Sequence, residues 1–218
     1  MKKLLMFAVL GAVGYYFYQN GFSVFGPKGA FDSNDKPLVV FFSGPGCDAY
    51  CDRVRSFLGS RKIEFEEIDI AGPDGAPVAN KYGVTGFPTT LIGRQEVRGD
   101  DLMKLTSVLA ETYGSQVLSR KENRLLSKHF DANGRAEVVM YATQWCPYCK
   151  KQREYFADKD IEYREVDVEA NQENKEQYAA LEASGYPLIY VGYRRFDGYH
   201  EGDLAAAIKE VAKAGPVR

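Results

Sequence analysis

The sequence predicts an α/β protein in which two similar units, each a mixed β-sheet with helices on both faces, follow an N-terminal transmembrane helix. Three observations predict this architecture. A short apolar run of buried-strand type at residues 37–42 returns at residues 136–141, 99 residues later, and Cys47 and Cys146 have the same separation. In each copy, strand-like and helix-like patterns alternate along the chain. The 218 residues are enough for two compact domains.

The composition narrows the class of protein. The net charge is −2, so the chain lacks the basic surface that nucleic-acid binding requires, and we expect no nucleic-acid partner. The four cysteines fall into two close pairs, Cys47 with Cys51 and Cys146 with Cys149. Close pairs indicate redox or metal chemistry more than a structural disulfide framework.

Residues 1–25 are predicted to anchor the chain in a membrane. The apolar stretch from 4 to 18 is short for a full span, which needs roughly 20 residues, but residues 22–25 extend it. Lys2 and Lys3 would stay on the cytoplasmic side, so the soluble domains would be periplasmic or otherwise extracytoplasmic. The alternative is a signal peptide, cleaved after the small residues at 12–14, which would give a secreted protein. Residues 26–35 are rich in Gly, Pro, Asp and Asn and are predicted to form a linker.

Two domains are predicted at residues 36–113 and 135–218, joined by a connecting helix and a turn at 114–134. Each is expected to run strand, cysteine pair, helix, strand, helix, Gly-x-Pro segment, two-stranded hairpin and helix. The second strands, at 63–70 and 161–168, lie 98 residues apart rather than 99. The difference arises because the first copy carries one extra residue between its cysteines.

Apolar residues recur with helical spacing after each cysteine pair and predict amphipathic helices that pack into the core. The first stripe comprises Tyr50, Val54, Phe57 and Leu58, and the second comprises Tyr148, Tyr155 and Phe156, with Gln152 in the place of Val54.

The second cysteine pair carries the clearest chemical signal. Cys146 falls at the predicted start of a helix, where unpaired backbone N–H groups and the helix dipole favour an anion such as a thiolate. Pro147 suits the first helical position, because its missing N–H costs nothing there. Cys149 lies one turn deeper and could resolve a mixed disulfide formed at Cys146.

A Gly-x-Pro segment follows each cysteine pair at the same distance, with Pro88 41 residues after Cys47 and Pro187 41 residues after Cys146. A proline that opens a strand cannot donate a ladder hydrogen bond, so it is expected beside a binding edge. If its peptide bond is cis, the preceding backbone is free to pair with an extended substrate.

These motifs resemble a known family. Trp-Cys-Pro-Tyr-Cys at 145–149 after a strand, with a Gly-x-Pro strand and a Gly-containing hairpin further on, resembles the glutaredoxins and the wider thioredoxin superfamily. Residues 82–90 of the first copy are similar to the stretch before the cis-proline of thioredoxin. The resemblance covers about residues 36–112 and 135–213 and implies two tandem thioredoxin-fold domains.

The resemblance also implies roles for individual residues. Cys146 would be the nucleophile, Cys149 the resolving cysteine and Pro187 a cis-proline, and Cys47 with Cys51 would form the corresponding redox pair. Residues expected to contact substrate are Trp145, Pro147, Tyr148, Tyr186 and Pro187 in the second copy and Phe87 and Pro88 in the first.

The first pair departs from the family pattern, because three residues rather than two separate Cys47 from Cys51. A disulfide needs a Cβ–Cβ approach of about 3.5–4.5 Å. We therefore expect the extra residue to be absorbed in the glycine-rich loop at 44–46, ahead of the helix. Asp48 beside Cys47 disfavours a thiolate. The first site is thus either a redox pair of altered potential or a vestigial one.

No resident cofactor is predicted beyond the two redox-active cysteine pairs. Glutaredoxins usually carry a Gly-Gly pair before the last helix, and residues 197–203 lack it, as in glutaredoxin-like proteins served by a protein reductant. We expect a protein electron donor or acceptor, with glutathione contacted through Asp203 as the alternative. His129 and His200 have no other ligand residues near them in the sequence, so we expect no metal site.

The predicted function is thiol–disulfide exchange on protein disulfides or dithiols in an extracytoplasmic compartment. One alternative is a non-catalytic module that binds an extended partner chain along the cis-proline edge. Another is a thiolate carrier of a metal or cluster. Whether the protein reduces, oxidises or isomerises disulfides depends on reduction potentials that residue types do not give.

Overall fold

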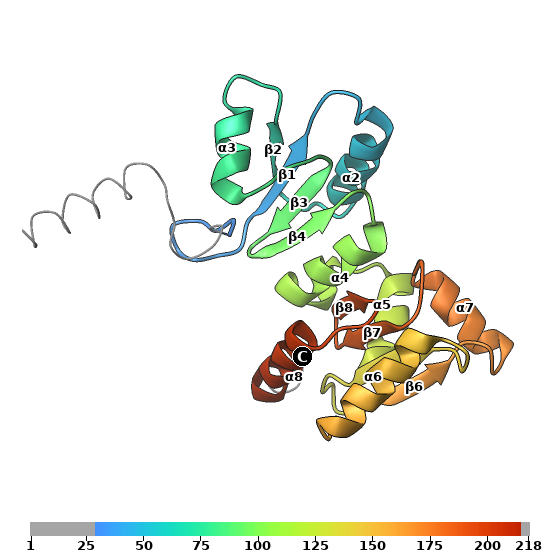
Figure 1. The fold of residues 1–218 in the computed structure, drawn as a ribbon. Coiled ribbons are helices and arrows are strands. Elements are labelled where there is room, and N and C mark those ends of the chain that lie inside the picture. The colour runs from blue at the N-terminus through green and yellow to red at the C-terminus, as the bar shows by residue number, and fades with distance from the viewer. Residues whose placement is uncertain (1–28, 215–218) are drawn as a thin grey trace, which may run out of the picture. The chain divides into compact units, whose positions relative to one another are not determined.

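The computed structural model describes residues 29–214, so the predicted anchor at residues 1–25 lies outside the described residues. The chain divides into two compact units, one up to Asp100 and one from Asp101 onward (Figure 1). Within residues 29–214, no helix is both long enough and apolar enough to cross a membrane.

The first unit is a four-stranded mixed sheet with helices. Its elements are β1 (Val39–Ser43), α2 (Asp48–Ser60), β2 (Glu66–Asp69), α3 (Gly75–Tyr82), β3 (Thr89–Ile92) and β4 (Gln95–Arg98). The strands lie in the order β2-β1-β3-β4. β1 pairs parallel with β2 and antiparallel with β3, and β3 pairs antiparallel with β4. All five residues of β1 are buried, as its continuous apolar run predicts.

The second unit repeats this arrangement. Its elements are α4 (Leu102–Tyr113), η1 (Ser115–Val117), α5 (Arg120–Leu126), η2 (Ser127–His129), β5 (Val138–Ala142), α6 (Pro147–Asp158), β6 (Arg164–Asp167), α7 (Gln172–Ala180), β7 (Leu188–Val191), β8 (Arg194–Asp197) and α8 (Gly202–Ala214). The strand order is β6-β5-β7-β8, with β5 parallel to β6 and antiparallel to β7. The two mixed sheets agree with the predicted pair of α/β units.

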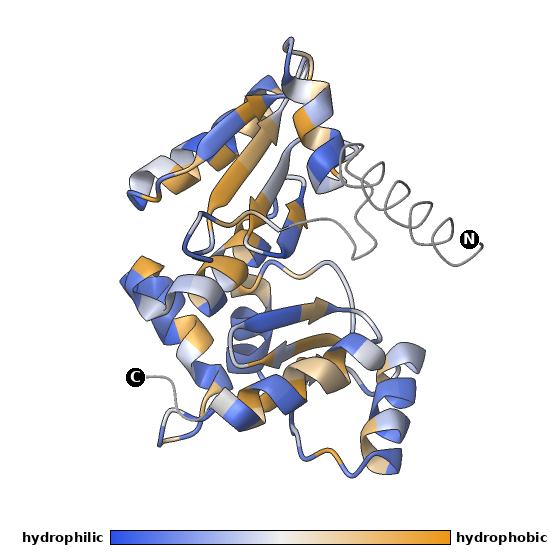
Figure 2. Ribbon diagram, turned by 90° about the vertical axis from the view of Figure 1, so that its left-hand side faces the viewer, coloured by the Kyte–Doolittle hydropathy of each residue, from blue (hydrophilic) through white to orange (hydrophobic). Residues whose placement is uncertain are grey.

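Helices cover both faces of the second sheet. On one face, Met140 and Ile189 of the strands pack with Phe156 of α6 and Leu204 of α8. The opposite face carries a core cluster that includes residues from α4, α5, β5 and β7: Met103, Leu126, Tyr141, Leu188 and Tyr190. The helices show apolar and polar patches side by side (Figure 2), which is typical of helices that bury one face.

Some predicted elements differ from the structure. The connecting helix predicted in 114–134 is divided into η1, α5 and η2, and a capping box between Ser119 and Glu122 begins α5. Part of the predicted linker packs against the first sheet, because the N–H of Ala30 donates to the carbonyl of Gly93 at 2.7 Å and Ala30 is fully buried. Tyr50 does not pack into the core as its helical spacing predicts, since it is 56% exposed.

Helix α4 lies in the second unit, although the sequence assigns residues 102–113 to the first domain. Glu111 of α4 forms an ion pair with Arg194 of β8, and Asp101, which caps the start of α4, lies 3.8 Å from Arg195. Met103 joins the core cluster that contains Tyr190. These contacts tie α4 to the second sheet. The domain limits at 36–113 and 135–218 stay predictions.

Candidate active site

The second cysteine pair lies at the start of helix α6, which follows strand β5 in the chain. Cys146 is the N-cap residue of α6 and has extended backbone dihedrals (φ −73°, ψ 118°), and Pro147 is the first helical residue. The N–H of Cys149 donates to the sulfur of Cys146 over 3.1 Å. The predicted place of Cys146 at the leading end of a helix is confirmed. An N-cap side chain that accepts such a bond stabilises the helix, and a thiolate accepts it more strongly than a thiol.

Both sulfurs belong to buried residues, with Cys146 4% exposed and Cys149 fully buried. Burial raises the pKa of the Cys149 thiol to about 12, and a side-chain hydrogen bond between this thiol and Cys146 adds to the shift. A backbone hydrogen bond from Thr143 and the positive charge of Arg153 act in the opposite direction. Cys149 is therefore a neutral thiol at neutral pH in the resting dithiol form.

Exposed aromatic side chains surround the buried pair. Trp145 is 67% exposed and Tyr148 is 58% exposed, so Tyr148, like Tyr50, does not pack into the core as its spacing predicts. The indole N–H of Trp145 donates to the carboxylate of Glu169 at 3.1 Å. The ring of Tyr186 meets the Trp145 ring edge-on at a centroid distance of 6.0 Å.

The structure brings the Gly-x-Pro segment to the same site. The peptide bond between Tyr186 and Pro187 is cis, as predicted. Tyr186 packs against the core cluster that holds Cys146 and Cys149. The cysteine pair, Trp145, Tyr186 and Pro187 therefore belong to one site, whereas their roles in substrate contact stay predictions.

In the first unit, Cys47 and Cys51 form a disulfide with a Cα–Cα distance of 5.4 Å. The expectation that the extra residue is absorbed in the loop at 44–46 is wrong. Helix α2 begins at Asp48, directly after Cys47, just as α6 begins directly after Cys146, so the additional residue lies within the helix. Cys47 has helical dihedrals (φ −92°, ψ −3°), and its carbonyl accepts the N–H of Cys51 at 2.7 Å. The disulfide therefore spans a full helical turn.

Phe87 and Pro88, the other residues predicted for the first site, follow helix α3 and precede strand β3. The peptide bond between Phe87 and Pro88 is cis, and Phe87 is 40% exposed. The aromatic ring of Phe87 lies close to Gly44, where an added Cβ would come within 2.6 Å of the ring. Phe87 thus covers the loop that leads to Cys47.

A charge pair that the sequence reasoning missed joins helix and strand near each cysteine pair. Arg153 of α6 donates two hydrogen bonds to the Glu165 carboxylate of β6, at 2.9 and 2.7 Å. Arg55 of α2 and Glu67 of β2 form the same pair, at 2.9 and 3.0 Å. Both arginines and both glutamates are related by the separation of 98 residues already found for the second strands, and this repetition is the signal that could have identified them.

Gln152 is a second residue whose role the sequence did not reveal. It is fully buried, and its side-chain amide exchanges two 3.0 Å hydrogen bonds with the backbone of His200. The N–H of Gly198, close by in the same loop, donates to the carbonyl of Pro187 at 2.8 Å. Gln152 therefore fixes the loop that adjoins the cis-proline.

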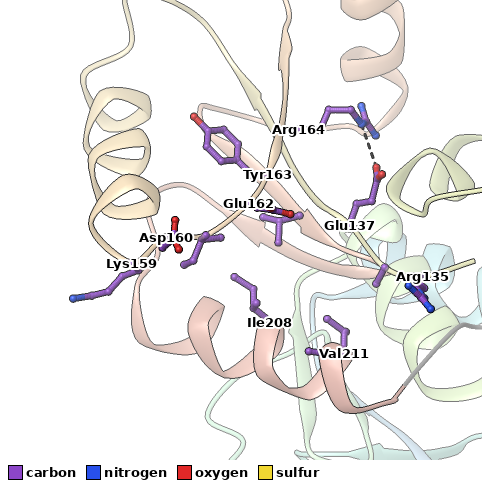
Figure 3. Close-up of a pocket in the computed structure, with 13 residues that line it drawn as sticks. Arg135, Glu137, Lys159, Asp160, Glu162, Tyr163, Arg164, Ile208 and Val211 are labelled. Carbon is purple, nitrogen blue, oxygen red and sulfur yellow. Dashed lines mark hydrogen bonds and ion pairs between the residues drawn. The ribbon is translucent and has the colours of Figure 1, made fainter.

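A cavity of about 910 Å³ lies elsewhere in the second unit (Figure 3). Its walls include Val138, Ile161, Tyr163, Ile208 and Val211, and its rim carries charges of both signs. None of the predicted site residues lines it, so it is separate from the cysteine chemistry. Among residues 29–214, no group of three or more His, Cys, Asp or Glu side chains is arranged to hold a metal ion.

Comparison with known proteins agrees with the geometry of the second unit. Residues 138–196 match the glutaredoxin family model. A glutaredoxin-like 8.6 kDa protein from the rubredoxin operon of Clostridium pasteurianum, itself uncharacterized, is 28% identical over 74 residues, which are 34% of this chain and 99% of that protein.

The chain is also similar to several proteins of solved structure. A glutaredoxin from Archaeoglobus fulgidus is 24% identical, with a TM-score of 0.31, over 35% of this chain and 89% of that one. Wheat glutaredoxin is 18% identical, with a TM-score of 0.34, over 41% and 94%. The first two thioredoxin domains of Saccharomyces cerevisiae Eps1p are 12% identical, with a TM-score of 0.28, over 90% and 100%.

The family match covers the strand before the cysteines, the cysteine pair, the cis-proline and part of strand β8. The second unit is therefore glutaredoxin-like, and this supports a place for the chain in the thioredoxin superfamily. It also supports a thiol–disulfide oxidoreductase type of function.

Proposed function

We propose that this chain is a dithiol–disulfide oxidoreductase whose second unit carries the reacting pair, Cys146 and Cys149. The observation that carries the proposal is the position of the Cys146 sulfur, which caps helix α6 and accepts the N–H of Cys149. A sulfur held this way is stabilised as an anion by the helix N-terminus, and the thiolate is the nucleophile in disulfide exchange.

The exchange proceeds in two steps. The Cys146 thiolate attacks one sulfur of a substrate disulfide, which breaks that bond, forms a mixed disulfide and releases the other substrate sulfur as a thiolate. Cys149 then loses its proton and attacks Cys146, so the intramolecular disulfide forms and the second substrate thiol leaves. Two electrons pass from the dithiol to the substrate, and the reverse sequence oxidises a substrate dithiol.

The substrates we propose are disulfides or dithiols in extended protein segments. The exposed rings of Trp145 and Tyr148 offer apolar contact area beside the sulfurs, and Tyr186 and cis-Pro187 border the same site. An extended segment could pair with the backbone ahead of Pro187. We further propose a protein redox partner, with glutathione as the alternative, and the two cysteine pairs as the redox groups.

We place this activity outside the cytoplasm on a membrane-tethered chain. The support is the sequence of residues 1–25, with Lys2 and Lys3 before an apolar stretch. A secreted form after signal cleavage is the alternative. Protease protection of the full chain in spheroplasts and inverted vesicles would distinguish the two sides of the membrane.

The test of function is a trapping experiment on the full chain. We expect Cys149→Ser to accumulate a mixed disulfide with an insulin substrate, because the resolving thiol is missing, and Cys146→Ser to form none. The double variant with serine at Cys47 and Cys51 is the matched control, and it should retain insulin reduction by the second unit. Full activity in Cys146→Ser would refute the proposal.

A further inference from the structure

Arg153 connects the groups that surround the buried resolving cysteine. It lies four residues after Cys149 on α6, which puts both side chains on one face of the helix. Its guanidinium bonds the Glu165 carboxylate through two nitrogens, at 2.9 and 2.7 Å, and donates to the carbonyl of Thr143 at 3.2 Å. Thr143 is fully buried and comes three residues before Cys146. The Arg153 side chain itself is only 25% exposed.

The resolving step requires a negative charge on Cys149, whose side chain is shielded from solvent. Cys149 must lose its proton to attack the mixed disulfide at Cys146, yet it is fully buried. Four ionisable groups lie around Cys149: Cys146, Arg153, Tyr186 and Glu165. Cys146 raises the pKa of Cys149 through a side-chain hydrogen bond, and Glu165 acts through its pair with Arg153. Arg153 is the cation among them.

Two groups lower the pKa of Cys149, and Arg153 is connected to both. One is the charge of Arg153 itself, and the other is a backbone hydrogen bond from Thr143 to the Cys149 sulfur. Because Arg153 also holds the carbonyl of Thr143, it fixes the residue that supplies the second contribution. Glu165 in turn holds the guanidinium in place with a bidentate pair, which has a defined geometry.

We propose that Arg153 is a positioning residue for the resolving step, in which it presents a positive charge to the Cys149 thiolate and holds Thr143 against the same sulfur. The inference rests on the proposed function and adds a residue outside the Cys-Pro-Tyr-Cys motif. In this step the proton of Cys149 goes to solvent. The Cys149 thiolate then forms a bond to the Cys146 sulfur, and the bond from Cys146 to the substrate breaks, with the electron pair leaving on the substrate thiolate.

The first unit provides a matched control. Arg55 pairs with Glu67 as Arg153 pairs with Glu165, but Arg55 lies in the unit whose cysteines are already joined in a disulfide. A change at Arg55 therefore removes an equivalent ion pair without touching the dithiol of the second unit.

Both chemical steps can be followed with one probe, the aromatic disulfide dithiobis(nitrobenzoate), mixed with the reduced second site of the full chain. Attack by Cys146 releases one coloured thionitrobenzoate, and resolution by Cys149 releases another. We expect Arg153→Met to leave the first phase unchanged and to slow the second about tenfold at neutral pH, since loss of a nearby opposite charge shifts a pKa by about one unit or more. In Arg153→Met, the pH profile of the second-phase rate should shift to higher pH by about one unit.

The control variants separate charge from structure. Arg153→Lys keeps the charge without the bidentate geometry, so its second phase should lie closer to the wild-type rate than that of Arg153→Met. Arg55→Met should change neither phase. An unchanged second phase in Arg153→Met, or equal slowing of both phases, would overturn the role of Arg153. Absence of the first phase in the wild-type chain would instead refute the proposed function.

Discussion

His129 should make the second unit less stable in acid, and the effect can be isolated with one substitution. The imidazole is fully buried at the end of η2, where it stacks on Tyr190 at a centroid distance of 4.0 Å. Its Nε2 is 2.9 Å from the hydroxyl of Tyr141, while its Nδ1 is buried without a hydrogen-bond partner among the described residues. An imidazolium would carry N–H groups on both nitrogens, so the charged form would bury an unpaired donor.

The direction and size of the effect follow from the pKa of His129. Burial lowers this pKa from 6.5 to about 3, and the charges of Arg164 and Lys128 contribute. The folded pKa is below the unfolded value, so the unfolded state binds the proton more readily between these limits. The contribution of the neutral His129 to stability is therefore fully present above pH 6.5 and is lost as the pH drops toward 3. At about pH 5, 1.5 units below the unfolded pKa, the loss is about 2 kcal/mol.

The assay is urea unfolding of the full chain between about pH 7.5 and pH 5. Trp145 is the single tryptophan of the sequence and lies in the second unit, so its fluorescence reports the unfolding of that unit. His129→Phe keeps an aromatic ring against Tyr190 and removes the titrating group. We expect the variant to lose about 2 kcal/mol less than the wild type over this pH range, whatever its stability at pH 7.5.

A substitution of the other histidine completes the design. His200→Phe tests whether the slope belongs to His129, because the sequence contains two histidines. If wild type and His129→Phe lose the same free energy of unfolding between pH 7.5 and pH 5, the buried neutral imidazole is not the source of the pH dependence and the reasoning fails.

Two further predictions concern the remaining buried contacts. Gln152→Leu should lower the free energy of unfolding of the second unit by about 2–3 kcal/mol, because the backbone N–H and C=O of His200 lose their partners. Trp145 fluorescence during urea unfolding measures this change. A cost below about 0.5 kcal/mol would contradict the role of Gln152. Serine at both Cys47 and Cys51 should destabilise the first unit by up to about 2 kcal/mol, the loop-closure value for five residues. Circular dichroism during thermal unfolding measures this change. An unchanged unfolding transition of the first unit would count against it.

The repeat made much of the fold predictable from the sequence. Residues 37–42 and 136–141 are short, mainly apolar runs, and they lead into the buried central strands β1 and β5. Pro88 and Pro187 recur at the same distance from the cysteines, and the family resemblance implied the cis bond at Pro187; the bond before Pro88 is cis as well. These features are local, and each is encoded by residue type and spacing within a short window.

The features that the sequence did not reveal depend on contacts between distant segments. Gln152 stands at a core position because its side-chain amide bonds the backbone of His200, 48 residues later. The residues near Gln152 in the sequence do not indicate this partner. Helix α4 lies between the two repeats in the sequence, and its assignment to the second unit depends on partners such as Arg194. Amphipathic periodicity shows that a helix buries a face, but it does not name the surface that covers it.

The extra residue of the first copy explains why the two cysteine pairs differ in local geometry. In both units the helix begins directly after the first cysteine, so the insertion moves the second cysteine from the third helical residue to the fourth. Cys146 has extended dihedrals that turn its sulfur back over the helix end, where it accepts the Cys149 N–H. Cys47 has helical dihedrals, and its side chain makes no capping hydrogen bond. A backbone N–H at the start of the helix therefore donates to the first cysteine sulfur in the second unit, whereas the first unit has no such bond and carries Asp48 beside Cys47. One inserted residue thus removes the backbone hydrogen bond to the first cysteine sulfur, while the disulfide itself still forms.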